Sequence, residues 1–379
     1  MTIGLTPASF GLPATDDDLT VLRLIRSRRV GPATFHRLIA EHGSARAALE
    51  ALPRIAAASG IADYQPFPEG VAAAELAAGR RIGARLIRHD SPDYPDRLRQ
   101  IDGAPAILWV RGDPAWLSRD MLAVIGARNA SSLGIRMARG MAAGLGEAGF
   151  VVAAGLARGV DTAAHAAALP TGTVAVMAGG VDVIYPAENA ALAARIAETG
   201  VLVSEQPPGT EPAARHFPTR NRIVSGLSQA VVVIEAAHRS GTLITARNAL
   251  DQGREVMAVP GHPMDARAAG CNALIRDGAT LVRSAADVAE ALALSGAALP
   301  QRIAAQAPRA IPAVESPRDA AQPIQLEGRI LDRLGPSPTE ENDLIRDLGQ
   351  SAATVSAAIL SLELQGRVTR MPGGRLALS

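Results

Sequence analysis

The strongest pattern in the chain is a series of short apolar runs that begins at Met121 and alternates with longer stretches of helical spacing. The runs end in glycine or polar residues and read MLAVIGA, FVVAAG, TVAVMAG, VLVSE, AVVVIEA, EVMAVPG and TLVRS. Continuous apolar strands that alternate with helices are typical of a parallel sheet covered on both faces. The pattern therefore predicts a doubly wound α/β domain with a mainly parallel sheet over residues 101–296.

Residues 1–100 show a different pattern, because apolar residues recur there at helical spacing. The stretch TVLRLIRSRRVGPATFHRLIAEHGSARAALEAL is interrupted at Gly31 and Pro32, which can end one helix and open the next. This predicts a small N-terminal helical domain of the SAM or helix-hairpin-helix type. The hairpin VGPATFHRLI is loosely similar to helix-hairpin-helix contacts with DNA, but it also suits plain helix packing, which we favour.

The C-terminal part divides into a linker and a further small domain. Residues 297–323 are rich in alanine and proline and have no periodicity, so they predict a linker. Residues 324–379 predict three helices, the third capped by Ser351, and a two-stranded hairpin that turns at Gly373 and Gly374, which is the winged-helix pattern. Its third helix contains no arginine and one acidic residue, Glu363, so we expect it to contact protein more than to read duplex sequence.

Composition restricts the chemistry and the compartment. The formal net charge is +1 over 379 residues, so any site for a polyanion must be local. Every basic residue other than histidine is arginine, which excludes Schiff-base and Walker-type lysines. The single cysteine, Cys271, excludes an internal disulfide, and the N-terminus resembles no signal peptide. We therefore expect a cytoplasmic protein with no membrane segment.

Four turns that we predict at strand ends combine glycine with arginine or hydroxyl residues. They are GARNASSLG from Gly126, GLARGVD from Gly155, FPTRNR from Phe217 and RSGT from Arg239. The carboxyl ends of parallel strands meet at one edge of a sheet, where ligands of such folds bind. Glycine lets backbone N–H groups approach an oxyanion, and the N-terminus of the following helix adds its positive dipole end. The turns therefore indicate an anion site.

Arginine side chains at these turns can supply planar forks for phosphate. The four candidates are Arg128, Arg158, Arg220 and Arg222. Phe217 can stack on an unpaired base, although a core position is the alternative. Each arginine alone also suits a surface salt bridge. Four such turns on one sheet edge favour phosphate binding.

Evidence for catalysis is thin. Glu205 and Glu235 lie near strand ends and are candidates for acid-base work, but either one also suits anchoring a neighbouring arginine. Asp161 and His165 lie four residues apart on one predicted helix, where they suit helix-end stabilisation better than catalysis. Neither GxSxG nor HExxH occurs, and His262 near Asp265 suggests only a loop contact. We predict no catalytic residue, no metal and no cofactor.

The chain resembles the DNA-processing protein A family, also called DprA or Smf. The resemblance rests on AVIGARNASSLG, GLARGVDTAAHAAAL, GGVDVIYPAEN, SEQPPG, FPTRNRIVSGLSQAVVVIEAAHRSGTLITARNALDQGREVMAVPG and GCNALIRDGA, which occur in this order. It implies a Rossmann-like domain that binds single-stranded DNA, protects it and helps to load the RecA recombinase onto it during natural transformation. It also implies a homodimer, and it makes the single-stranded DNA-binding protein of the cell a candidate partner.

The turns and the resemblance together predict one nucleic-acid-binding set. Its members are Gly126, Arg128, Ser131, Gly155, Arg158, Gly159, Phe217, Arg220, Asn221, Arg222, Ser240, Gly241 and Thr242. Asn221 also suits a helix cap. Two positions depart from the family pattern: Ala127 replaces the usual serine and Leu133 replaces a frequent tyrosine. We therefore weight the arginines above the hydroxyl groups of that loop.

Two other functions remain as alternatives. The predicted sheet also resembles the cytokinin-activating phosphoribohydrolases, but Ile244 and Thr245 occupy the positions after Gly-Thr where those enzymes carry a carboxylate. A winged-helix transcription regulator is the other alternative, against which the cation-free third helix counts.

Overall fold

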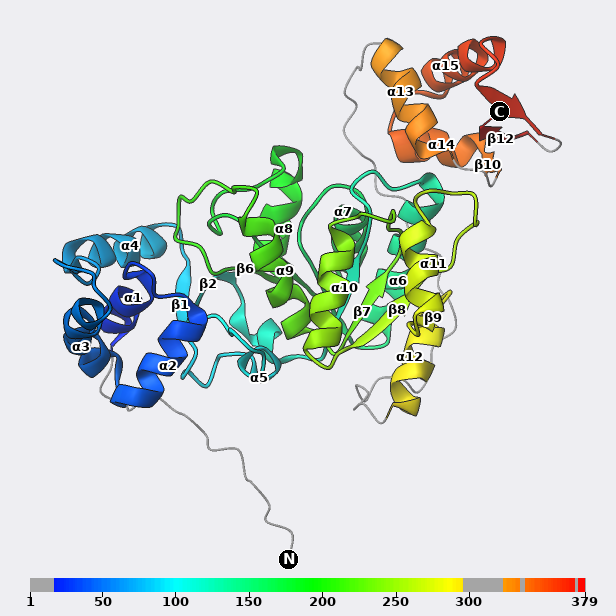
Figure 1. Cartoon of the computed structure of the whole chain (residues 1–379). Helices are drawn as coiled ribbons and strands as arrows, with labels where there is room; N and C mark the ends of the chain where they lie inside the picture. Colours follow the sequence, from blue (N-terminus) through cyan, green and yellow to red (C-terminus); the bar gives the residue numbers. More distant parts are fainter. Residues whose placement is uncertain (1–16, 296–322, 335–337, 372–373, 379) are drawn as a thin grey trace, which may run out of the picture.

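The computed structural model describes residues 17–295, 323–334, 338–371 and 374–378 (Figure 1). Apart from Pro323, the predicted linker 297–323 lies outside the described residues, and so does Gly373 of the predicted hairpin turn. Within the described ranges, no helix has the length and apolar character needed to cross a membrane.

A nine-stranded sheet forms the centre of the molecule, in the order β1-β2-β6-β5-β4-β3-β7-β8-β9. All seven strands predicted from the apolar runs are present, and each pairs in parallel with its neighbours of that set. They are β3 (Met121–Ile125), β4 (Val151–Ala154), β5 (Thr173–Val176), β6 (Val201–Ser204), β7 (Ala230–Val233), β8 (Glu255–Ala258) and β9 (Thr280–Leu281). The strand order reverses at β3, because β4 pairs on one side of it and β7 on the other.

Two antiparallel strands extend the sheet at one edge. β2 (Ile107–Gly112) pairs with β6, and β1 (Arg85–Arg88) pairs with β2. The pattern of apolar runs did not predict these strands. Because β1 belongs to the central sheet, we propose that the boundary of the N-terminal domain lies before Arg85 and not near residue 100.

Helices cover both faces of the sheet, as expected for a doubly wound fold (Figure 1). One face is covered by α6 (Ser132–Glu147), α7 (Val160–Ala168), α8 (Ala190–Thr199) and α12 (Ala285–Leu294). The other is covered by α5 (Asp96–Arg99), α9 (His216–Leu227), α10 (Thr242–Asp251) and α11 (Ala269–Arg276). Two short 3-10 helices, η1 (Pro114–Ser118) and η2 (Ala187–Asn189), lie in connections. Successive strand residues point to opposite layers, so Leu122 and Val124 pack on α6 while Ala123 packs on the α9 side.

The N-terminal helices form a separate apolar core. They are α1 (Asp18–Arg26), α2 (Pro32–His42), α3 (Ala45–Ala58) and α4 (Glu69–Arg81), and the predicted break at Gly31 and Pro32 is confirmed. Trp109 of β2 inserts into this core against Gly79, where any Cβ would overlap the indole ring. The indole N–H donates to Glu75 at 3.0 Å, and Glu75 pairs with Arg26 at 2.9 Å. The helical unit is therefore joined to the sheet by a packed and fully hydrogen-bonded tryptophan.

The C-terminal unit has the predicted winged-helix arrangement. Its helices are α13 (Pro323–Arg333), α14 (Glu341–Leu348) and α15 (Ala352–Leu364), and its strands are β10 (Thr339–Glu340), β11 (Val368–Arg370) and β12 (Arg375–Leu378). The predicted cap is confirmed, because the Ser351 side chain accepts from the Thr354 N–H at 3.2 Å. The strands form a three-stranded sheet in the order β10-β12-β11, with β10 added to the expected hairpin.

Candidate nucleic-acid interface

The loop after β3 turns sharply into α6 and is held by a partly buried carboxylate. Ser131 is the N-cap of α6, and its hydroxyl accepts from the Gly134 N–H at 2.9 Å. Glu235, which follows β7, accepts from both the backbone N–H and the hydroxyl of Ser131. Burial raises the pKa of Glu235, although its bonds to Ser131 act in the opposite direction. Ser131 is therefore a structural cap and is itself buried.

Two glycines allow this loop and the loop after β4 to approach each other. Gly159, the N-cap of α7, has φ of 76°, and a Cβ there would overlap the carbonyl oxygens of Ala127 and Arg128. A Cβ on Gly126 would lie 2.6 Å from Cγ2 of Val160. Gly126 and Gly159 are therefore required for loop packing, which places Arg128 and Arg158 on adjacent loops.

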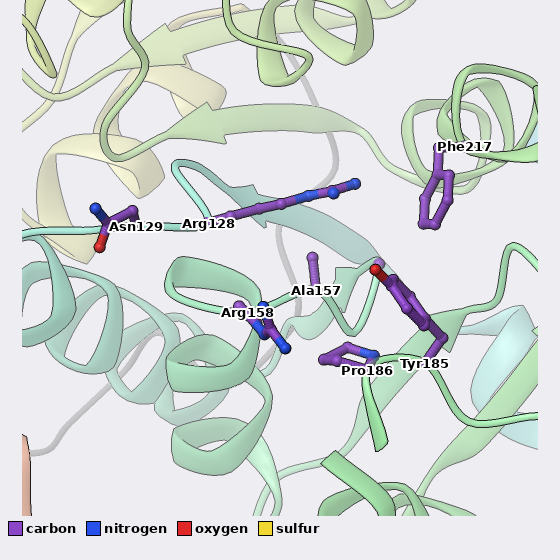
Figure 2. Close-up of a pocket in the computed structure, with 8 residues that line it drawn as sticks. Arg128, Asn129, Ala157, Arg158, Tyr185, Pro186 and Phe217 are labelled. Atoms are coloured by element: carbon purple, nitrogen blue, oxygen red, sulfur yellow. The ribbon is translucent and has the colours of Figure 1, made fainter. Parts of the chain in front are cut away.

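Arg128, Arg158 and Phe217 line one cavity at this edge, with a volume of about 270 Å³ (Figure 2). Arg128 is exposed, and its guanidinium lies 5.0 Å from the centre of the Phe217 ring. The Tyr185 ring meets Phe217 edge to face, with a centroid separation of 5.8 Å. Figure 2 shows Arg128 reaching across the pocket toward Phe217, with Tyr185 nearby. The cavity thus combines a free fork of N–H donors with two aromatic rings.

The second exposed arginine of the pocket carries a weak intramolecular partner. Arg158 donates to Glu188 at 2.9 Å, and the two side chains are 58% and 54% exposed. An ion pair at this exposure contributes about 0–1 kcal/mol. A phosphate can therefore compete with Glu188 for Arg158.

We expected FPTRNR to form a turn at a strand end, and this expectation was wrong. The segment lies in the first turns of α9, whose N-cap is Arg215. Pro218 occupies the third helical position, where the first-turn N–H groups have no intrahelical acceptor and a missing N–H costs little. The helix places Phe217 at the pocket, and it turns Arg220 into the core. Asn221 lies within the helix, so the expected alternative role as a cap is also wrong.

Arg220 lies beneath the floor of the pocket. Its side chain is buried, with 6% of the residue exposed, and Nη1 donates to the carbonyl oxygens of Gly155 and Val176 at the ends of β4 and β5. A Cβ on Gly155 would overlap the guanidinium, so glycine is needed there. Burial lowers the pKa of Arg220 to about 10, while Asp161 acts in the opposite direction. Arg220 therefore stays charged at neutral pH and contributes positive potential from below.

Arg222 also has a structural partner. It pairs with Glu205 at 2.6 Å, and both side chains are largely buried. Glu205 thus anchors an arginine. This is the role that the sequence offered as the alternative to acid-base work. Arg222 and Glu205 do not line the cavity described above.

The RSGT turn lies beyond β7, on the far side of β3 from the pocket. Thr242 donates from its hydroxyl to the Gly126 carbonyl at 3.0 Å, and the Ser240 hydroxyl accepts from the Thr242 N–H at 3.2 Å. Gly241, which precedes α10, is exposed. These residues tie two loops together across the switch in strand order but do not line the cavity.

Asp161 and His165 are both buried and each bonds to the backbone near Gly155. Asp161 accepts from the N–H groups of Gly155 and Ala157 at 2.9 and 3.3 Å, and burial raises its pKa. His165 accepts from the Leu156 N–H at 3.3 Å. Both residues therefore shape the loop after β4, in agreement with the structural role favoured from the sequence.

The tautomer of His165 follows from its second partner. Nδ1 lies 2.7 Å from the Thr173 hydroxyl, which already donates to the Val152 carbonyl at 2.6 Å. Nδ1 must therefore carry the proton, and Nε2 is the acceptor. A second proton on the ring would have to lie on Nε2, where it would point at the Leu156 N–H, which is also a donor. Burial, together with the nearby Arg220, lowers the pKa of His165 to about 3.

We expect the free energy of unfolding to fall as the pH is lowered from about 6.5 toward 3. In this window the unfolded chain protonates His165 and the folded chain does not, so protons favour unfolding by up to about 1.4 kcal/mol per pH unit. Urea titrations from pH 7 to 4 on the full chain and on His165→Gln measure this. The variant should be less stable at pH 7, and its deficit should shrink with acid. A constant deficit across the range would contradict a neutral buried His165.

Sequence reasoning missed four residues that line the pocket, namely Asn129, Ala157, Tyr185 and Pro186. Tyr185 and Pro186 belong to the GGVDVIYPAEN motif, which follows β5. The available signal was an aromatic residue beyond the end of a parallel strand, in a chain with only three tyrosines. Neither glycine nor arginine precedes it directly, so the search for anion-binding turns did not find it.

The cysteine and the loop histidine considered from the sequence do not line the pocket. The described ranges contain no cluster of three or more histidine, cysteine, aspartate or glutamate side chains suited to a metal ion. Cys271 is buried against β7, and burial raises the pKa of its thiol to about 12. His262 contacts the Met264 N–H in a loop, as expected from the sequence.

The fold and the pocket define a class of three-part proteins in which a Rossmann-like domain lies between a small helical unit and a winged helix. Residues 85–293 match the model of the family described as DNA recombination-mediator protein A. Residues 15–78 match the DprA-like N-terminal HHH domain, and residues 314–374 match the DprA winged helix domain. The chain belongs to the DNA recombination-mediator protein A family, which confirms the resemblance seen in its motifs.

Individual relatives and solved structures agree with this assignment. DNA processing protein DprA of Bacillus subtilis is 43% identical over 220 residues, which cover 57% of this chain and 74% of the relative. Protein Smf of Escherichia coli is 38% identical over 318 residues, which cover 83% of each protein. The X-ray structure of DprA from Streptococcus pneumoniae has a TM-score of 0.57 at 32% identity, covering 74% of this chain and 94% of that chain.

A second solved structure is that of DNA processing protein A from Helicobacter pylori, which is described as giving insights into a unique single-stranded DNA binding mode. Its TM-score is 0.52 at 26% identity, and the match covers 56% of this chain and 96% of that chain.

Proposed function

We propose that this protein binds single-stranded DNA in a sequence-tolerant way through the pocket at the ends of β3, β4 and β5. The observation that carries the proposal is Arg128 stacked on Phe217 beside Tyr185. An arginine fork recognises any phosphate, and aromatic rings stack on any base that is free of its complement. The related Helicobacter pylori protein, with its single-stranded DNA binding mode, supports the same role for this fold.

Duplex DNA fits this pocket less well. Its bases are paired and stacked, so Phe217 and Tyr185 have no open base face to contact. Phosphate contacts remain possible with duplex DNA, but they position a strand without reading it. A preference for unpaired strands is therefore the signature of the proposed site.

The protein binds the strand and catalyses no reaction on it. The three carboxylates considered for acid-base work have structural partners: Glu235 holds Ser131, Glu205 holds Arg222, and Asp161 accepts from backbone N–H groups. None of the three lines the pocket. This supports a non-enzymatic binder over the phosphoribohydrolase alternative. Incubation with nucleoside monophosphates should release no free base.

We further propose that the complex helps to load the RecA recombinase onto the strand during natural transformation, within the cytoplasm. The family description as a recombination mediator supports this step. We also propose that the protein acts as a homodimer, and that the cell's single-stranded DNA-binding protein is a further partner. The homodimer and this further partner follow from the family resemblance.

A gel-shift comparison of unpaired and duplex oligonucleotides of equal length tests the binding proposal. We expect the unpaired strand to bind more tightly, and addition of recombinase with ATP should give a further shifted species. Tighter binding to a defined duplex sequence would instead favour the transcription-regulator alternative.

The aromatic part of the pocket can be tested separately from its charge. Phe217→Leu should weaken binding of an oligothymidylate about tenfold, because one base loses a stacking surface worth about 1–3 kcal/mol. The salt dependence of binding should not change, because no charge is removed. Tyr185→Phe, which keeps the ring, is the matched control and should bind as the unaltered chain does. Fluorescence anisotropy measures both, and equal binding by all three proteins would remove stacking from the proposal.

A further inference from the structure

The winged-helix unit contacts the sheet domain through arginines of the sheet domain and oxygens of the winged-helix unit. Arg136 and Arg139, on α6, pair with Asp343 and Asp347 of α14, the second pair at 3.3 Å. Arg267, which precedes α11, donates to the carbonyl oxygens of Asp332 and Leu334 at 2.6 Å each.

The contact is polar in character. The buried apolar side chains of the winged-helix unit pack within that unit, around Leu344 and Ile359. Asp343 also pairs with Arg346 at 3.1 Å, and Arg267 also pairs with Asp265 at 3.2 Å. The side chains of the Arg136–Asp343 pair are 35% and 22% exposed, and pairs at such positions contribute little and are screened by salt. A contact of this kind can therefore be exchanged for another anion.

Its place in the fold links the contact to the pocket. α6 begins at Ser132, directly after the loop that carries Arg128, and Arg136 lies about one helical turn further on. α6 also packs along α7, whose N-terminus follows Arg158. A strand that leaves the pocket over α6 would therefore meet these arginines next.

One carboxylate of this contact, Asp347, lacks part of its hydrogen bonding. The Asp347 side chain is 2% exposed, and its Oδ2 is buried with no hydrogen-bond partner among the described residues. A buried carboxylate oxygen without a donor costs free energy. Release of α14 into water would recover that cost, which lowers the free energy needed for exchange.

We propose that Arg136, Arg139 and Arg267 form a second site for phosphates of a single strand, and that oxygens of the winged-helix unit occupy it when no strand is bound. The inference rests on the function proposed above and extends the bound path from the pocket along α6. The winged helix and the nucleic acid then compete for the same guanidinium groups. Binding of a long strand displaces the winged-helix unit, whereas a strand short enough to fill only the pocket does not.

The test uses the full chain with Asp343→Asn and Asp347→Asn together. Oligothymidylates of about five and about twenty nucleotides, short and long relative to typical binding sites, serve as probes in fluorescence anisotropy. The long probe should bind about tenfold more tightly to the variant. Its slope of log affinity against log salt should steepen by about 1.4, since two arginines are freed at about 0.7 each. The short probe should bind as before.

Glu327→Gln with Glu363→Gln is the matched control, because it removes the same charge from the same unit at residues that contact Gln365 and Arg370. A similar gain in this control would assign the effect to general charge and overturn the inference. The inference is equally overturned if the Asp343→Asn and Asp347→Asn chain binds the long probe with unchanged affinity and slope. Should Asp347→Asn fold poorly, Asp343→Asn alone carries the test, with a slope change of about 0.7.

The same measurements separate this inference from the proposed function. If the unaltered chain binds both probes and Arg128→Ala weakens both, the pocket is the binding site. Binding of the long probe to the Asp343→Asn and Asp347→Asn chain then tests the second site by itself. If Arg128→Ala binds both probes as the unaltered chain does, the pocket proposal itself fails.

Discussion

Replacement of Arg128 by alanine should weaken binding of single-stranded oligonucleotides about 30-fold at moderate salt. Arg128 is exposed at the pocket and has its guanidinium held over Phe217, so its N–H donors are oriented before a strand arrives. Loss of a charge-assisted hydrogen bond to phosphate costs about 2 kcal/mol. The slope of log affinity against log salt should fall by about 0.7, because one phosphate contact is lost. Fluorescence anisotropy at several salt concentrations measures both quantities.

Arg119 provides a matched control for this substitution. It is also an exposed arginine stacked on an aromatic ring, 5.3 Å from the centre of Trp116, but it precedes β3 and so lies at the opposite end of that strand. Arg119→Ala removes the same charge and a similar stacking contact, and binding should stay unchanged. Equal losses in the two variants would show that the pocket has no special role. Neither substitution should change the melting temperature appreciably, since both side chains are exposed.

Replacement of Arg220 by alanine should lower the free energy of unfolding by about 3–5 kcal/mol, the cost of removing one partner from a buried charged network. The carbonyl oxygens of Gly155 and Val176 would lose their donor. Asp161 would lose the nearby positive charge that opposes the rise of its pKa. A cavity would remain where the guanidinium lay. Chemical denaturation at neutral pH measures the loss.

Arg128→Ala serves as the comparison, because it removes an arginine that lines the pocket at an exposed position. We expect the two substitutions to differ in effect: Arg128→Ala should weaken binding with little change in stability, and Arg220→Ala should lower stability first. If Arg220→Ala were as stable as the unaltered chain and still failed to bind, Arg220 would have to contact the strand directly. That result would contradict its place beneath the pocket floor.

The central sheet could be predicted because its strands carry the signal in consecutive residues. The parallel strands β3 to β7 are buried on both faces, so they appear as unbroken apolar runs such as AVVVIEA. β2 also carries a buried apolar run, ILWV, but it lies before Met121, where the predicted series begins, and β1 has no such run. β1 consists of Arg85–Arg88 and has a single buried residue, Ile87, so it could not be told from a loop. Its pairing with β2 is a contact between distant segments, which local patterns do not contain.

The pocket could be predicted only in part. Arg128, Arg158 and Phe217 were identified, and the structure brings them to one cavity with Gly155. Arg220 and Arg222 share the same short motif, but α9 directs Arg220 into the core and pairs Arg222 with Glu205. Arg220 and Arg222 are two residues apart on the helix, so their side chains point in different directions, and the position of the helix relative to the sheet decided their roles.

The sequence by itself determined the fold class, the three-part organisation and the presence of arginine, glycine and aromatic residues at the sheet edge. These properties reside in local composition and periodicity, which burial and backbone geometry impose on neighbouring residues. Only the tertiary structure decided which arginines remain free, that Tyr185 completes the pocket, and that carboxylates of α14 lie on the arginines of α6. The physical reason is that desolvation and ion pairing depend on distances between segments far apart in the chain, and identical guanidinium groups acquire different roles from their surroundings.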